Sequence, residues 1–161
     1  MKTKQQFYTA ALATLLMGTS SSVLADTVVG NASANILTPA SLTENTAMAF
    51  ADIGGVGTVT LSNDGSDTVT PGAGTIVSGA AEGVFTVTGA AGQLFTLSAI
   101  PDATLTHADT STMTVASITP STTTGTVGDT FNVGGSITLT GSETAGGGGY
   151  TGTYNVTVNY Q

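Results

Sequence analysis

The sequence predicts an all-β domain with the architecture of an antiparallel β-sandwich, on three observations. Apolar residues recur mostly at every second position, which is the period of a strand with one buried face. Thr is frequent beside Val, Ile and Phe, a combination typical of half-exposed strands. Gly-rich and Pro-containing turn sequences separate the apolar runs. Together these features indicate about nine or ten short strands around one core.

The alternating runs place the central strands in order. They cover residues 56–61, 84–87, 94–97, 113–115 and 137–139. Turn signals stand at Asn63-Asp64-Gly65, Pro71-Gly72, residues 89–92, Pro101-Asp102, Gly134-Gly135 and residues 146–149. Residues 117–128, rich in Thr, Ser and Gly, are predicted to be a mobile loop. No helix is predicted beyond the first 25 residues.

The first 25 residues have the three parts of a secretory signal peptide. Lys2 and Lys4 precede an apolar run over residues 7–17, and small residues close the segment at Ala25. We expect cleavage before Asp26, and the run is shorter than the roughly 20 apolar residues of a transmembrane helix. The expected organisation is a signal peptide (1–25), an N-terminal extension or donor strand (26–38) and a sandwich domain (39–161), exported to the cell surface.

The charge distribution excludes several classes of partner. The signal segment holds both Lys residues, so residues 26–161 carry ten carboxylates and no Lys or Arg. Nucleic acid is not an expected partner, because its affinity depends on Lys and Arg neutralising phosphates. Membrane insertion is not expected either, and the absence of Cys excludes disulfides and thiolate metal sites.

The N-terminal extension alternates small and larger apolar residues on one face. That face carries Val28, Gly30, Ala32, Ala34 and Ile36, and its larger side chains stand at the two ends. Such a segment is either the first strand of its own domain or a strand that lies in the groove of a neighbour by β-strand addition. The residues alone leave both interpretations open.

The C-terminal region shows the cleanest alternation in the chain. Tyr154, Val156, Val158 and Tyr160 alternate with Thr and Asn over residues 150–160. This pattern predicts a continuous strand, either an ordinary central strand or an open edge that a partner must cover.

A resemblance to known proteins follows from motifs that occur in order along the chain. They are residues 34–42, 48–50, 83–95, 131–139 and 149–160. In these segments the chain resembles a family of secreted bacterial domains of unassigned function. That family is similar in layout to chaperone-usher pilins and to spore-coat-U-like pilins, which often end in a penultimate aromatic residue with a Gly upstream. Tyr160 and Gly148 stand in those places, whereas the Cys pair of many such pilins is absent.

The resemblance implies an incomplete immunoglobulin-like sandwich that is completed by a donated strand. The implied donor residues are Val28, Gly30, Ala32, Ala34 and Ile36, and the implied acceptor or chaperone-recognition residues are Gly148, Tyr150, Tyr154, Val156, Val158 and Tyr160. It also implies a structural filament subunit whose partners are copies of itself or related subunits, a periplasmic chaperone and an outer-membrane usher. The alternative is a self-complete secreted module that binds a glycan or a protein.

Catalytic and metal-binding patterns are weak. His107, with Asp109 and Ser111 nearby, is predicted to be a solvated loop residue because no nucleophile-elbow sequence surrounds it. Residues 63–67 favour an Asx turn over a calcium loop, because the distant Glu of such a loop is missing. Carbohydrate chemistry is disfavoured because the chain has no Trp. We therefore expect no enzyme, cofactor or metal.

Overall fold

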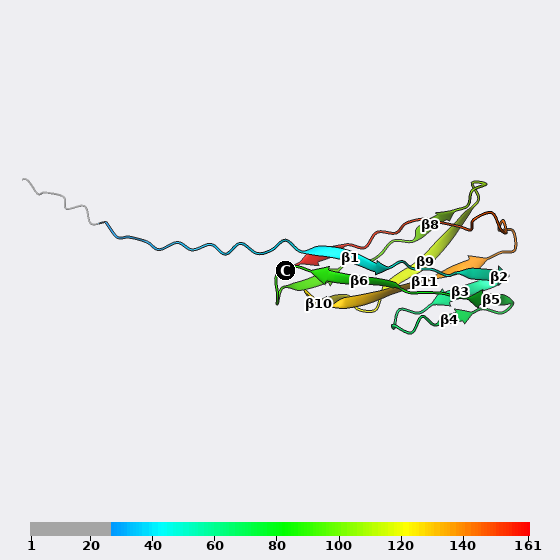
Figure 1. Cartoon of the computed structure of the whole chain (residues 1–161), viewed down its shortest axis with the longest axis horizontal. Helices are drawn as coiled ribbons and strands as arrows, with labels where there is room; N and C mark the ends of the chain where they lie inside the picture. Colours follow the sequence, from blue (N-terminus) through cyan, green and yellow to red (C-terminus); the bar gives the residue numbers. More distant parts are fainter. Residues whose placement is uncertain (1–26) are drawn as a thin grey trace, which may run out of the picture. The chain divides into compact units, whose positions relative to one another are not determined.

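The computed structural model describes residues 27–161, which form twelve strands and no helix (Figure 1). The strands are β1 (Ser41–Thr46), β2 (Asp52–Gly55), β3 (Gly57–Leu61), β4 (Val69–Pro71), β5 (Thr75–Ser78), β6 (Gly83–Thr88), β7 (Leu94–Leu97), β8 (Ala103–Thr106), β9 (Thr112–Pro120), β10 (Thr124–Thr126), β11 (Thr130–Leu139) and β12 (Val158–Tyr160). No helix that could span a membrane is found in this part of the chain. The predicted signal peptide lies outside the described residues.

The largest sheet is built around β11. Along one edge β11 pairs first with β6 and then with β3, and along the other it pairs with β9, always antiparallel. β1 extends this sheet beyond β6, β4 extends it beyond β3, and β8 extends it beyond β9. The pattern of β11 explains its central place, since Phe131, Val133 and Ile137 each point inward and are at most 1% exposed.

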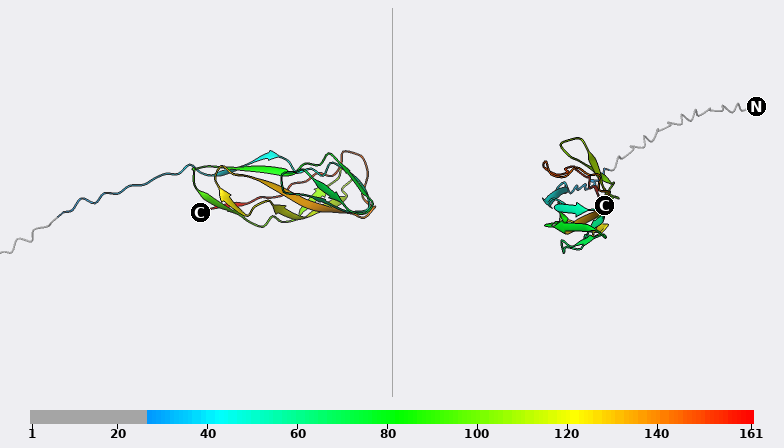
Figure 2. Two further views of the ribbon diagram at one scale, coloured as in Figure 1. Left: turned by 90° about the horizontal axis from the view of Figure 1, so that it is seen from below. Right: turned by 90° about the vertical axis from the view of Figure 1, so that its right-hand side faces the viewer.

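The second layer is a three-stranded sheet in the order β10-β7-β12, and β2 and β5 form a separate pair. Phe85 and Phe131 of the large sheet stack with centroids 5.5 Å apart, and Phe131 lies 6.4 Å from Phe95 of β7. These three rings join the two sheets across one core. Figure 2 shows the strands of this domain running lengthwise, and the predicted all-β antiparallel sandwich is confirmed.

One predicted turn is wrong. Gly134 and Gly135 lie in the middle of β11, not between strands. A side chain at Gly134 would collide with the carbonyl oxygens of Leu61 and Ser62, and one at Gly135 would crowd Val115. The glycine pair therefore permits β3 and β9 to approach β11 closely, at a position where the β9 register shifts by a bulge.

The predicted loop over residues 117–128 is also wrong. β9 continues to Pro120, and β10 follows at Thr124–Thr126, where it pairs with β7. Between them the Thr122 hydroxyl donates to the Thr124 carbonyl at 2.6 Å, and the Ser121 N–H donates to the Asn132 carbonyl at 2.8 Å. Thr and Ser were misleading here because they serve both strands and tight turns.

Candidate functional site

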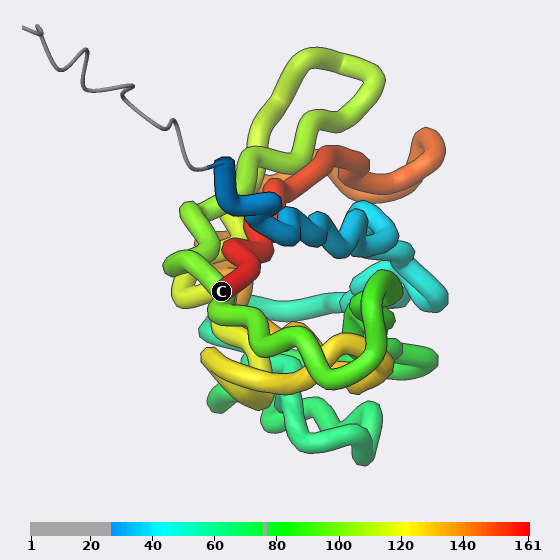
Figure 3. Tube along the Cα trace, turned by 90° about the vertical axis from the view of Figure 1, so that its left-hand side faces the viewer, coloured from blue at the N-terminus to red at the C-terminus, as the bar shows by residue number. Residues whose placement is uncertain are grey.

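Two sheet edges face the same side of the domain without pairing. β1 ends the large sheet and β12 ends the three-stranded sheet, and within residues 27–161 no ladder joins them. We call the strip between β1 and the C-terminal segment, residues 150–160, the seam. Figure 3 shows β1 (cyan) and the C-terminal residues (red) on the same side of the domain. The seam is a place where a sheet is interrupted.

The C-terminal segment is extended, but most of it is not a strand, which corrects the prediction. Only Val158–Tyr160 forms β12, and Thr151 makes an isolated bridge with Thr106. Among the described residues the backbone N–H and C=O groups of residues 152–156 form no hydrogen bond. The reason lies in the adjacent segment of the same chain. β7 ends at Leu97 and β8 begins at Ala103, so no continuous strand borders residues 152–156.

The floor of the seam is apolar. Tyr154, Val156, Val158 and Tyr160 are half-buried and pack against the core, while the residues between them are exposed. From the other edge, Leu42 of β1 packs against the same core. The predicted inward face of the C-terminal segment is thus confirmed, although the predicted continuous strand does not form.

The Tyr154 side chain reaches the aromatic residues of the core. Its ring meets Phe85 edge-on at 6.1 Å, and a side chain at Gly83 would collide with its hydroxyl. That hydroxyl is buried and has no hydrogen-bond partner among the described residues. Burial, with a smaller contribution from the Glu44 carboxylate of β1, raises the pKa of Tyr154 to about 12.

A cleft of about 780 Å³ lies at one end of the seam. One wall is residues 48–55, which follow β1, and the other is residues 145–154, which lead into the C-terminal segment. Leu105, Met113, Ile137 and Leu139 contribute apolar surface between these walls. The cleft therefore continues the apolar floor of the seam.

The predicted donor residues lie in a segment without secondary structure. Residues 27–40 form no helix or strand, and Val28, Gly30, Ala32, Ala34 and Ile36 are all exposed. The exposed fractions are 86% for Val28, 87% for Val29 and 94% for Ile36. Residues 27–34 belong to a different compact unit from residues 35–161, so each is described by itself.

Two of the six predicted acceptor residues, Gly148 and Tyr150, lie at the cleft and not in the floor of the seam. Gly148 is exposed in the loop of residues 146–149, with a φ of 103°. The Tyr150 hydroxyl lies 2.9 Å from the Ser111 hydroxyl and accepts a 2.9 Å hydrogen bond from the Thr144 N–H. These residues line the cleft or border it, whereas Tyr154, Val156, Val158 and Tyr160 form the floor of the seam.

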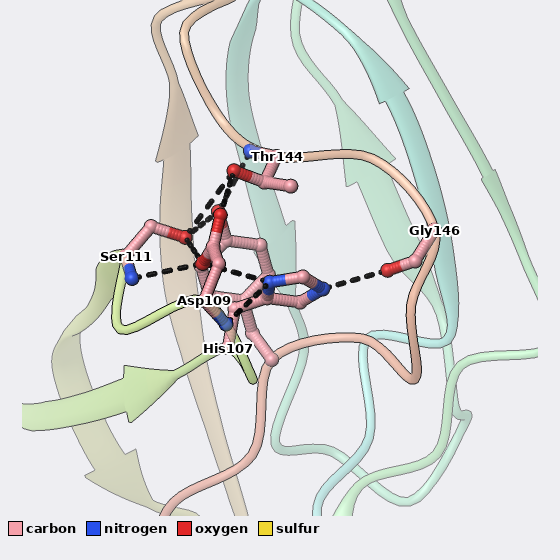
Figure 4. A network of polar contacts seen from close by, with 6 residues as sticks. His107, Asp109, Ser111, Thr144 and Gly146 are labelled. Carbon is pink, nitrogen blue, oxygen red and sulfur yellow. Dashed lines mark hydrogen bonds and ion pairs between the residues drawn. The ribbon is translucent and has the colours of Figure 1, made fainter.

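His107 lies at the centre of a polar network, so its prediction as a solvated residue is wrong. Its side chain is only 5% exposed. Nδ1 lies 2.8 Å from Asp109 Oδ1, and Nε2 lies 2.7 Å from the Gly146 carbonyl oxygen (Figure 4). The Tyr150 ring covers the imidazole at a centroid distance of 5.2 Å. Sequence reasoning missed this burial because residue 146, its partner, is 39 positions away.

The carboxylate of Asp109 is saturated with donors. The Ser111 hydroxyl and N–H donate to Oδ1 at 2.6 and 2.9 Å, and the Thr144 hydroxyl donates to Oδ2 at 2.6 Å. The hydrogen bond from the Ser111 hydroxyl has the largest effect among several that hold the pKa of Asp109 well below its usual value of 3.8. Ser111 therefore donates to Asp109 and not to His107, which is not the arrangement of a nucleophile and its base.

A buried carboxylate organises the turn between β3 and β4. Glu82, only 1% exposed, accepts hydrogen bonds from the Ser62 hydroxyl at 2.6 Å and from the Gly65 N–H at 2.8 Å. Asp64 accepts from the Ser66 N–H at 3.1 Å, which is the predicted Asx turn. Within residues 27–161 no three His, Cys, Asp or Glu residues are grouped as metal ligands would be. No sequence signal marked Glu82, because its donors are mostly backbone groups.

Comparison with known proteins gives a family but no biochemistry. Residues 40–160 match the model of a domain of unknown function, DUF4402. The matched region begins one residue before β1 and ends at the last residue of β12. No curated protein and no solved structure matches the chain. Because the match covers most of the sequence, the chain belongs to the DUF4402 family of domains of unknown function.

Proposed function

We propose that this protein is a structural subunit of an extracellular filament, in which the seam of one copy accepts the N-terminal extension of the next. The observation that carries the proposal is the unpaired backbone of residues 152–156 above an apolar floor. In residues 27–161 this segment has the side-chain alternation of a strand without a neighbour to pair with. An added strand would supply that neighbour.

The energetics favour an extended peptide as the occupant. Each ladder hydrogen bond contributes about 1 kcal/mol net, and burying a Val or Ile side chain contributes about 2 kcal/mol. The extension offers apolar Val28 and Ile36, both exposed, with Gly30, Ala32 and Ala34 between them. Small side chains in the middle fit a floor that already holds large rings such as Tyr154.

The same features support the wider expectations that the protein is exported and that other proteins assist its assembly. A subunit with an apolar seam needs a cover before it reaches its neighbour, because an uncovered edge aggregates. A periplasmic chaperone and an outer-membrane usher would meet that need, and the protein would then act at the cell surface. The role is non-enzymatic in this proposal.

A self-complete binding or adhesion module is the second candidate. The cleft of about 780 Å³ favours it, because Tyr150, Glu143 and the glycine-rich loop place polar groups around apolar surface. Size-exclusion chromatography of the exported chain separates the two candidates. A stable monomer at high concentration supports the module, and concentration-dependent polymers support the filament subunit.

The direct test is deletion of residues 26–35 from the exported chain. We expect the truncated protein to fold, because the family match and every strand within residues 27–161 lie beyond this segment, but to form no polymer. Negative-stain electron microscopy and sedimentation measure the outcome. Normal polymers from the truncated chain would refute strand donation.

A matched pair of substitutions sharpens the test. Val28 and Val29 are equally exposed, at 86% and 87%, and they point to opposite faces of an extended strand. Val28→Asp places a carboxylate on the face proposed to enter the seam, whereas Val29→Asp places it on the outer face. We expect the first variant to block assembly and the second to assemble; equal behaviour would contradict the assigned face.

A further inference from the structure

His107 is held between two hydrogen-bond acceptors. The Asp109 carboxylate, which already accepts from Ser111 and Thr144, accepts from Nδ1, and the Gly146 carbonyl accepts from Nε2. The Gly146 carbonyl has no proton to give, so Nε2 carries one, whereas Nδ1 faces the Asp109 carboxylate at 2.8 Å and, at the longer distance of 3.4 Å, the Asp109 N–H. Only the imidazolium donates to both acceptors at once, and in that form His107 is the only cationic side chain in residues 27–161.

The Gly146 carbonyl belongs to the loop of residues 146–149, and within residues 27–161 no other hydrogen bond holds this loop. Its four glycines have φ values of 79°, 68°, 103° and 73°, a region that other residues adopt only with strain. Gly147 lies against the imidazole, since a side chain there would approach Nε2 to 3.0 Å. Ordering consecutive glycines costs more conformational entropy than ordering other residues, so the bond from His107 matters to the loop.

This loop is also part of the cleft. Residues 145–149 stand opposite residues 48–55 and continue into the C-terminal side of the seam. We propose that protonated His107 is a latch that holds residues 145–149 as one wall of the cleft, and that loss of its proton releases this wall and weakens strand binding at the seam. The second half of this statement rests on the proposed function.

The direction of the effect follows from the charges around the ring. The hydrogen bond to Asp109, followed by the bond to Gly146, raises the pKa of His107 above its usual 6.5. Two other titratable groups, Glu143 and Tyr150, line the cleft beside this loop. Glu143 does not change charge around that pH, because the N–H of Thr140 lowers its pKa to about 2. The latch therefore closes in mild acid and opens as the pH rises.

Nuclear magnetic resonance tests the latch directly, because the chain has a single His. The imidazole carbon signals of the exported chain give the His107 midpoint, and the amide signals of residues 146–149 report on the loop. We expect the midpoint to lie above 6.5 and the glycine signals to shift with the same midpoint. A midpoint at or below 6.5, or glycine signals that ignore it, would overturn the proposal.

Two substitutions of one kind provide the control. Asp109→Asn removes the charge beside Nδ1, so the His107 midpoint falls and the loop opens at lower pH. Asp129→Asn alters a carboxylate that accepts from the Thr126 N–H at 2.7 Å in the turn before β11, and it leaves both midpoints unchanged. Equal shifts in the two variants would mean that the latch is not built from Asp109.

Assembly measured over the same pH range tests the consequence at the seam. We expect self-association of the exported chain to weaken about three- to tenfold on passing from below to above the His107 midpoint. His107→Gln should remove this pH dependence. Polymers with no pH dependence would overturn the regulatory half while leaving the filament proposal intact. Absence of polymers at every pH would refute both the filament proposal and the proposed effect of His107 on strand binding. The resonance data alone decide whether His107 holds the loop.

Discussion

Two segments of this molecule have the same alternating sequence and opposite environments. β11 has partners on both edges, and its inward residues Phe131, Val133 and Ile137 are buried. Residues 150–160 point Tyr154, Val156 and Val158 at the same core, yet residues 152–156 pair with no strand among the described residues. The side-chain pattern thus decides which face of a segment is apolar, whereas the presence of a neighbouring strand decides whether its backbone is paired.

Truncating a side chain of β11 should lower the free energy of unfolding far more than truncating one in the floor of the seam. Phe131 is 1% exposed and contacts two other aromatic rings, so Phe131→Ala is expected to lower the free energy of unfolding by about 3–5 kcal/mol. Val156→Ala removes part of a half-buried side chain and should cost about 1 kcal/mol in the unassembled chain. Urea unfolding at low protein concentration measures both values. Similar losses would mean that the seam is as well packed as β11.

A glycine of β11 should tolerate an added side chain far less than a glycine at an exposed position. Gly134→Ala drives a methyl group into the carbonyl oxygens of β3, and we expect a loss of about 2–3 kcal/mol in the free energy of unfolding. Gly30→Ala, in the N-terminal extension, meets nothing within 4 Å and serves as the control. Thermal unfolding reports both. Tolerance of the first variant would contradict the close approach of β3 to β11.

The loop beside the seam should make the stability of the fold depend on pH, whereas β11 should not. Because the hydrogen bond to Asp109 raises the pKa of His107 in the folded protein, the stabilisation by protonated His107 is complete below pH 6.5. It is lost as the pH rises through the pKa of His107 in the folded protein. We therefore expect the urea midpoint to fall modestly between about pH 6 and about pH 9. His107→Gln should flatten this slope, and an unchanged slope would assign it to another group.

Added salt should have the smallest effect of these changes, and it should leave the polymers intact. Residues 27–161 contain no Lys or Arg, so Lys–carboxylate and Arg–carboxylate pairs cannot hold together the copies of the proposed polymer. In that proposal the attraction comes from ladder hydrogen bonds and apolar contacts, and salt only screens the repulsion between acidic surfaces. We expect light scattering to show intact polymers in moderate salt at neutral pH. Dissociation under these conditions would show that ion pairs contribute.

The sequence predicted the parts of the molecule that depend on local pattern. The strands around Val59, Phe85, Phe95 and Ile137, and the inward face of residues 154–160, were found because alternation reports burial directly. The glycines within β11 were misjudged, since a close approach between strands leaves the same local signature as a turn.

The polar parts of the candidate site were hidden for a related reason. The environment of His107 depends on a carbonyl oxygen 39 residues away, and Glu82 is bound largely by the turn over residues 62–67. Partners of this kind are set by the folded chain and leave no spacing rule in the sequence. The missing neighbour of residues 152–156 is a similar case, because a strand pattern cannot say whether a partner is present.

Amide hydrogen exchange of residues 152–156, measured before and after assembly, reports directly on whether the seam accepts an added strand. In the unassembled chain these amides should exchange rapidly while those of β11 are protected, because only the latter are hydrogen-bonded among the described residues. On assembly residues 152–156 should become protected as the added strand pairs with them, and β11 should not change. Protection already present in the monomer, or continued rapid exchange in the polymer, would contradict the account of an open seam filled by a neighbouring copy.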